Sequence, residues 1–169
     1  MPNNLEPTMV RDVKFKNPLL HATYQDNETE QHLKECPPDV PGAAYSIEWE
    51  MSPYHARALR AELKAHYVSC YPNSPFTKVI GMKKKNNGNY EFRATRNGTN
   101  SQGGLNDKPR VIDGAKQPLA DLAFLSGSKG SIKVNAYPVT DDSGNGTMRL
   151  LIDTVQVVDA IYSIRPDID

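Results

Sequence analysis

The residues of this chain whose types could do chemistry are cations and tyrosines, and together they could hold a strand of nucleic acid. Residues 57–116 contain 12 Lys and Arg against 4 Asp and Glu, although the whole chain of 169 residues has no net charge. A cationic groove follows the phosphates of a single strand, and aromatic side chains stack on its bases. The candidates for these two roles are Lys83, Lys84, Lys85, Tyr90, Arg93, Arg96, Lys108, Arg110, Lys116, Lys129, Lys133 and Tyr137.

Tyr137 has the strongest case among the aromatic residues. From residue 132 onward, apolar side chains alternate with Lys133, Asn135 and Tyr137. A strand with this pattern carries a cation, an amide and an aromatic ring on one face. The next run, residues 148–158, is mostly apolar and is expected to be core, with Arg149 as its only cation.

Tyr90 is a second candidate for stacking, because it lies between basic residues, and Phe15 is a third. For each of these aromatic residues, the alternative to contact with a base is a structural role. For the basic segment, the alternative is an ordinary solvated surface, which is what most charge clusters are.

No arrangement of residues indicates catalysis or metal binding. The chain has four histidines, none of them in an HExxH motif, and two cysteines without the spacing of zinc ligands. Gly127-Ser128-Lys129-Gly130 is only a fragment of a phosphate-loop motif, and GxSxG is absent. The sequence therefore predicts a binding protein that is not an enzyme and uses no cofactor or metal.

Composition indicates one domain with a small core and long loops. Hydrophobic residues make up 38% of the chain, and there are 13 Pro and 11 Gly residues. No stretch approaches the roughly 20 apolar residues of a membrane span, and the N-terminus lacks the apolar middle of a signal peptide. We therefore expect a cytosolic protein in which Cys36 and Cys70 are free thiols.

Period-two alternation and turn residues predict a mainly β protein with antiparallel strands. Apolar residues share one face of residues 44–51, so we expect Trp49 and Tyr45 to pack in the core. Asn86-Asn87-Gly88 predicts a hairpin turn. The predicted strands are residues 12–24, interrupted by Pro18, then 44–51, 77–85 and 89–95, and finally a pair within 128–162.

One helix is predicted at residues 53–68, where Ser52 can cap the first turn and leucines recur at four-residue spacing. Polar residues predict long loops at 25–43 and 96–118, and residues 119–125 can form a helical turn. One helix among five or six short strands predicts a small closed or nearly closed barrel.

Five segments of the chain occur in the order in which a known family carries them. They are VKFKNPLLHA and AYSIEWEMSPYHARALRAEL, then DKPRVIDG and GSKGSIKVNAYPV, and finally GNGTMRLLIDTVQVVD. Together they span most of residues 12–160, and LLIDTVQVV is the most specific of them. On these segments the chain resembles the OB-fold single-stranded DNA-binding proteins of tailed bacteriophages.

The resemblance implies a five-stranded antiparallel OB-fold barrel over residues 12–162, with one helix after the second strand. It also implies a flexible N-terminal arm at residues 1–11 and a short acidic C-terminal end at residues 163–169. In this family the barrel coats and protects single-stranded DNA, without sequence preference, during phage replication, recombination or repair in the host cell cytoplasm. The acidic end contacts phage replication proteins, and we expect a monomer or weak homodimer.

Two other functions fit the same residues. A barrel of this kind can serve in protein interaction or virion assembly, but such a surface is expected to expose apolar anchors where residues 57–116 carry lysines. OB barrels also hold single-stranded RNA. Competition between matched DNA and RNA oligomers separates that case from binding of DNA.

Overall fold

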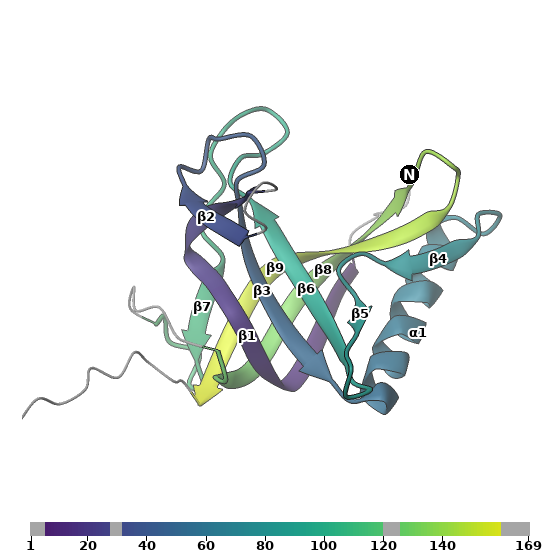
Figure 1. Ribbon diagram of the computed structural model, residues 1–169, viewed down its shortest axis with the longest axis horizontal. Helices are drawn as coiled ribbons and strands as arrows, with labels where there is room; N and C mark the ends of the chain where they lie inside the picture. The colour runs from purple at the N-terminus through teal and green to yellow at the C-terminus, as the bar shows by residue number, and fades with distance from the viewer. Residues whose placement is uncertain (1–5, 28–31, 120–125, 160–169) are drawn as a thin grey trace, which may run out of the picture.

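The computed structural model describes residues 6–27, 32–119 and 126–159, which form a β-barrel with one helix packed against its end (Figure 1). The strands and the helix follow one another along the chain as β1 (Glu6–Asn27), β2 (His32–Cys36), β3 (Ala44–Met51), α1 (Pro53–Cys70), β4 (Phe76–Val79), β5 (Lys83–Lys84), β6 (Tyr90–Asn97), β7 (Arg110–Asp113), β8 (Lys129–Thr140) and β9 (Gly146–Asp159).

Five of these strands close the barrel, in the order β1, β3, β6, β9, β8 and back to β1. The β6–β9 pair runs parallel, through Thr95 and Leu151, and the other four pairs are antiparallel. A closed barrel with an odd number of strands cannot alternate direction all the way round, so at least one parallel pair is unavoidable. The predicted five-stranded OB-fold barrel with its helix after the second barrel strand is confirmed, but it is mixed rather than antiparallel throughout.

The barrel core follows from the alternation of apolar residues along its strands. Trp49 and Phe92 lie opposite each other on β3 and β6, are fully buried, and stack with ring centroids 5.7 Å apart. Tyr45 is also buried, so the prediction that Trp49 and Tyr45 belong to the core is confirmed. On β8, Ile132, Val134 and Ala136 point inward in the same way.

Helix α1 begins where predicted and ends two residues later than predicted. The Ser52 hydroxyl accepts a hydrogen bond from the backbone N–H of His55, which satisfies one free donor of the first turn. Its buried stripe ends at Tyr67, whose ring lies against Gly146 at the start of β9. A Cβ at position 146 would overlap the Tyr67 ring, so only glycine lets the helix and β9 approach this closely.

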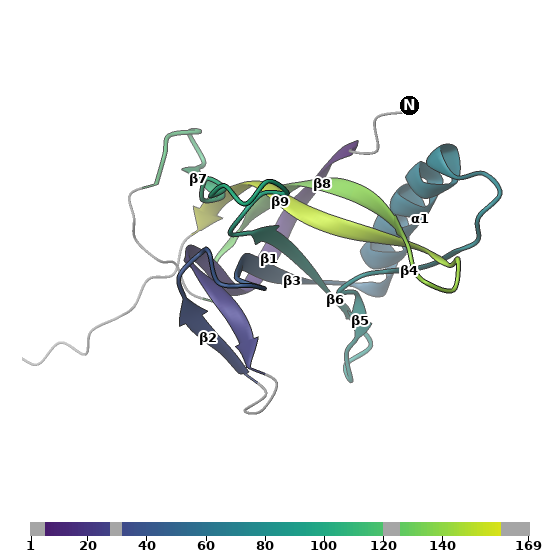
Figure 2. The same ribbon diagram turned by 90° about the horizontal axis from the view of Figure 1, so that it is seen from above.

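The first strand is longer than predicted. Residues 6–10 pair with β8, so they are not part of a flexible arm over residues 1–11, and residues 1–5 lie outside the described part of the chain. Register shifts and positive φ angles at Asp12 and Asn17 let β1 bend and pass from β8 to β3. Figure 2 shows the far end of β1 leaving the barrel to pair with β2.

Three predictions for the connecting segments were wrong. The predicted loop 25–43 contains the strand β2, and the predicted loop 96–118 contains β7, which runs parallel to β9. The predicted strand 77–85 is split at Gly81, so β4 joins β9 in parallel and only Lys83 and Lys84 pair with β6. Short strands of this kind carry no apolar alternation of their own, because their pairing is set by strands distant in sequence.

The predicted helical turn at 119–125 lies almost wholly outside the described residues, as does the acidic end at 163–169. Within the described ranges, no helix has the length and the apolar character needed to cross a membrane.

Candidate nucleic-acid interface

The outer face of β8, β9 and β6 carries a continuous row of polar, cationic and aromatic side chains. Tyr137 lies opposite Arg149, Asn135 opposite Leu151, and Leu151 beside Thr95. Their neighbours along each strand, apart from Arg96 beside Thr95, are buried, so these side chains point away from the core. We call the set the outer strip, and it consists of Arg93, Thr95, Arg149, Leu151, Asn135 and Tyr137.

A pocket of about 350 Å³ lies at one end of the outer strip, where β6 and β9 come together. Arg93 and Arg149 line it from the two strands, and Ile80, which is 39% exposed, adds an apolar wall. Among the described residues that line this pocket, none carries a carboxylate. Guanidinium groups bind phosphate through paired hydrogen bonds, so the pocket suits the backbone of a nucleic acid.

Arg93 is held in place by the backbone around it. Gly81 passes so close above β6 that a Cβ there would lie 3.1 Å from the Cβ of Arg93. The Nε–H group of Arg93 is buried and has no hydrogen-bond partner within the described part of the chain. A buried donor without a partner costs free energy.

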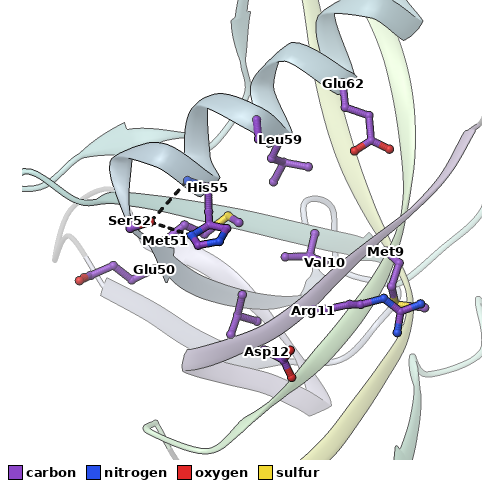
Figure 3. Close-up of a pocket in the computed structure, with 12 residues that line it drawn as sticks. Met9, Val10, Arg11, Asp12, Glu50, Met51, Ser52, His55, Leu59 and Glu62 are labelled. Atoms are coloured by element: carbon purple, nitrogen blue, oxygen red, sulfur yellow. Dashed lines mark hydrogen bonds between the residues drawn. The ribbon is translucent and has the colours of Figure 1, made fainter.

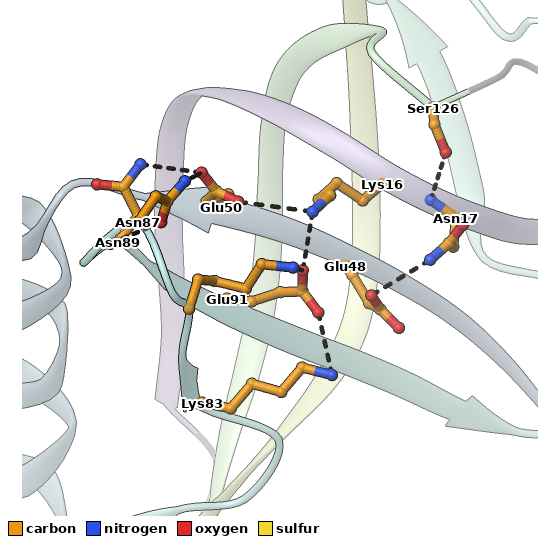
Figure 4. Close-up of polar contacts among 10 residues, drawn as sticks. Lys16, Asn17, Glu48, Glu50, Lys83, Asn87, Asn89, Glu91 and Ser126 are labelled. Carbon is orange, nitrogen blue, oxygen red and sulfur yellow. Dashed lines mark hydrogen bonds and ion pairs between the residues drawn. The ribbon is translucent and has the colours of Figure 1, made fainter.

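A second face of the barrel, over β1, β3 and β6, carries charges that neutralise one another (Figure 4). At its centre is Glu91, whose side chain is only 5% exposed. Its carboxylate lies 3.0 Å from the ammonium of Lys16, 3.3 Å from that of Lys83 and 3.2 Å from that of Lys85. We call these four residues the Glu91 cluster.

The pKa values around this cluster follow from burial and from the lysines. Burial raises the pKa of the Glu91 carboxyl, but hydrogen bonds from Lys16 and Lys85 outweigh it and lower the pKa to about 2. Burial raises the pKa of Glu48, and the neighbouring Glu91 raises it further. Glu50 has a lowered pKa, because the side-chain amides of Asn89 and Asn87 donate to its carboxylate.

The structure divides the predicted lysines and aromatics of the 77–95 hairpin between different environments. Lys83 and Lys85 belong to the Glu91 cluster, whereas Lys84 is exposed. Tyr90 is half-buried and packs against the hydrophobic core, on the same side of β6 as Phe92. Phe15 is fully buried, so the prediction that it could stack on bases was wrong.

The other predicted cations are spread around β7 and the end of β9. Arg110 and Lys133 flank Thr154 in one row across β7, β9 and β8, and Lys133 lies 3.9 Å from the carboxylate of Asp153. The Nε–H of Arg96 donates to the backbone oxygen of Asp107 at 2.7 Å. Three exposed lysines lie beyond the outer strip, before β7, after β7 and at the start of β8, and these are Lys108, Lys116 and Lys129.

Two cations that the sequence prediction passed over take central positions. Arg149 was assigned to a core strand, but the turn at 141–145 pairs Thr140 with Gly146 and therefore sets Arg149 opposite Tyr137. Counting the hairpin register outward from that turn would have found it. Lys16 joins the Glu91 cluster from a strand distant in sequence, and no local pattern predicts that contact.

A larger pocket, of about 630 Å³, lies between β1 and α1 (Figure 3). Its floor is apolar, with Val10, Met51 and Leu59 among the lining residues. Three carboxylates also line it, those of Asp12, Glu50 and Glu62. Because carboxylates repel phosphate, this pocket is a poorer site for a nucleic-acid backbone than the arginine pocket.

Comparison with known proteins adds to this geometry. No protein-family model and no curated protein matches the sequence. Among solved structures, the chain is similar to gp2.5, a single-stranded DNA binding protein encoded by bacteriophage T7. The two share a TM-score of 0.61 and 12% identity, over 96% of this chain and 91% of that one.

The chain is also similar to the single-stranded DNA-binding protein from bacteriophage Enc34 in complex with single-stranded DNA. That comparison gives a TM-score of 0.61 and 13% identity, over 99% of this chain and 95% of that one. These matches span nearly the whole of both chains, so the chain has the fold of these phage proteins, as the sequence resemblance predicted. At 12% and 13% identity, these comparisons show the fold alone.

Proposed function

We propose that this protein binds single-stranded DNA on the outer strip and the arginine pocket, without catalysis and without sequence preference. It would coat and protect the strand during phage replication, recombination or repair in the host cell cytoplasm. Two similar folds belong to phage single-stranded DNA-binding proteins, one of them solved with single-stranded DNA.

The observation that carries the proposal is the convergence of Arg93, Arg149 and Tyr137 on one outer face from three strands. Arginine neutralises phosphates, and a base stacked on an aromatic ring contributes about 1–3 kcal/mol. Both groups are present here, beside a pocket in which no described lining residue carries a carboxylate. This combination fits a polyanion with flat bases better than it fits a protein surface.

The chemistry of the strip supports binding without sequence preference. Its arginines and its tyrosine recognise phosphates and ring faces, which every nucleotide has. Thr95 and Asn135 are the polar uncharged side chains of the strip, so it offers few groups that could read the edges of bases. The proposed contacts of the acidic C-terminal end with phage replication proteins involve residues outside the described part of the chain.

The experiment that tests this proposal is a fluorescence-polarisation titration with labelled oligo-dT, duplex DNA and RNA of equal length. Two phosphate contacts, from Arg93 and Arg149, predict a log–log salt slope of about −1.4 and a roughly sevenfold loss of affinity between about 50 and 200 mM salt. We expect oligo-dT to bind more tightly than the duplex. Equal affinity at the two salt concentrations contradicts the proposal, and tighter binding of RNA reassigns the ligand.

A further inference from the structure

The Glu91 cluster occupies the face that carries most of the lysines first expected to bind DNA. Lys16 comes from β1, Lys83 from β5 and Lys85 from the turn after β5, and all three ammonium groups contact one carboxylate (Figure 4). These contacts join residues up to 75 positions apart, so the barrel itself assembles the cluster.

Carboxylates on this face offset part of its positive charge. Glu91 lies opposite Glu50 in the β3–β6 ladder, and Glu48 lies opposite Arg93 and contacts Asn17. Among the described residues of this face, the carboxylates of Glu48, Glu50 and Glu91 therefore stand against five cations, which are Lys14, Lys16, Lys83, Lys85 and Arg93. A polyanion is attracted by net positive potential, and this face offers far less of it than a count of its lysines indicates.

We propose that Glu91 acts as an internal competitor for phosphate, which withholds Lys16, Lys83 and Lys85 from single-stranded DNA and so sets its affinity. This inference rests on the proposed function, because it concerns how tightly the same ligand is held. Glu91 would then determine the affinity without contacting the DNA in the proposed site.

Burial and position favour contact of the lysines with the Glu91 carboxylate over contact with a DNA phosphate. It is almost fully buried, and the side chains of Lys16 and Lys85 are only one-third exposed, so these two charged contacts are partly shielded from water, which strengthens them. Glu91 is part of β6, so its contact with the lysines is intramolecular. A phosphate binds from solution, and its attraction to the lysines is screened by salt. The lowered pKa of Glu91 keeps the competitor charged at neutral pH.

Substitution Glu91→Gln tests the inference, because the amide keeps the shape and removes the charge. Each phosphate newly contacted by a released lysine strengthens binding to oligo-dT roughly five- to tenfold at about 50 mM salt and steepens the log–log slope by about 0.7. Glu62→Gln, at an exposed residue of α1, is the control for net charge alone and is expected to bind like the wild type. Adding Lys83→Ala to Glu91→Gln removes the part of the gain that comes from Lys83.

A second measurement does not depend on how well Glu91→Gln folds. In the wild-type background Lys83→Ala and Lys85→Ala each change the affinity for oligo-dT by less than a factor of two, because these ammonium groups already contact the Glu91 carboxylate. Losses of twofold or more in these variants overturn the inference, as does an unchanged affinity of folded Glu91→Gln. A wild-type protein that does not bind single-stranded DNA refutes the proposed function instead, so the two failures are distinguishable.

Discussion

Tyr137 on β8 lies directly opposite Arg149 on β9, and both side chains are on the outer face of the barrel. Residues that face each other across an antiparallel pair have Cβ atoms about 5 Å apart. The tyrosine ring and the guanidinium therefore form one contact surface, on which a nucleotide can place its base on the ring and its phosphate on the arginine.

Substitution Tyr137→Ala is expected to weaken binding of oligo-dT by about 1–3 kcal/mol, because one stacked base is lost. Tyr137→Phe keeps the ring and is expected to bind nearly as well as the wild type. Fluorescence polarisation measures both. Tyr54→Ala is the matched control, since Tyr54 is 74% exposed on α1, outside the outer strip. Equal binding by Tyr137→Ala and wild type contradicts the stacking role.

The emission of Trp49 is expected to stay unchanged when oligo-dT binds. Trp49 is the only tryptophan, is fully buried, and stacks on Phe92 inside the barrel, so bases cannot reach it. A fluorescence titration measures this directly, and its emission maximum is expected at the short wavelengths of a buried indole. Strong quenching by DNA under conditions where the protein stays folded contradicts this position.

Acid is expected to destabilise the fold through Glu91. Its pKa is about 2 in the folded protein against an ordinary value of 4.5, so the ionised carboxylate contributes stability that is fully present above about pH 4.5. This contribution, on the order of 3 kcal/mol, is lost as the pH falls from about 4.5 through 2. Urea unfolding at a series of pH values measures it.

The Glu91→Gln variant is the control for this titration, and its unfolding free energy should vary less over the same pH range. Glu48 acts in the opposite direction, because its raised pKa makes the folded state take up a proton before the unfolded state does. Glu48→Gln is therefore expected to make the loss of stability in acid larger. Identical pH profiles for wild type and Glu91→Gln contradict the assignment.

Gly146→Ala is expected to lower the free energy of unfolding by about 1–3 kcal/mol, because the new methyl group overpacks the contact with Tyr67. Gly114→Ala is the matched control, since a Cβ at position 114 meets nothing within 4 Å. Thermal unfolding followed by circular dichroism compares them. A melting temperature of Gly146→Ala equal to that of the wild type shows that α1 and β9 are not packed as described.

Where a local pattern in the sequence is strong, it correctly predicted the helix or strand. The alternation of Tyr45, Ile47 and Trp49 predicted β3 with its correct limits, and the Ser52 cap predicted the start of α1. The same alternation on β8 placed Tyr137 outside and Ile132 inside.

Contacts between distant strands could not be predicted in this way. A period-two pattern predicts which face a lysine occupies. It does not predict whether a carboxylate on a neighbouring strand lies within ion-pair distance of that lysine. Lys16 and Glu91 meet because β1 and β6 both flank β3, which is a property of the closed barrel. Strands β2 and β7 were missed for the same reason, since each depends on a partner strand and carries little pattern of its own.

The most direct test of the proposed interface is the salt dependence of oligo-dT binding by the double variant Arg93→Ala, Arg149→Ala. Two lost phosphate contacts predict a log–log slope that is shallower by about 1.4 than that of the wild type, with much weaker binding at about 50 mM salt. The control is Arg57→Ala, Lys64→Ala, which removes two exposed charges from α1 and should leave the slope unchanged. A double arginine variant with the wild-type slope and affinity would contradict the account, because the arginine pocket would then not hold the DNA backbone.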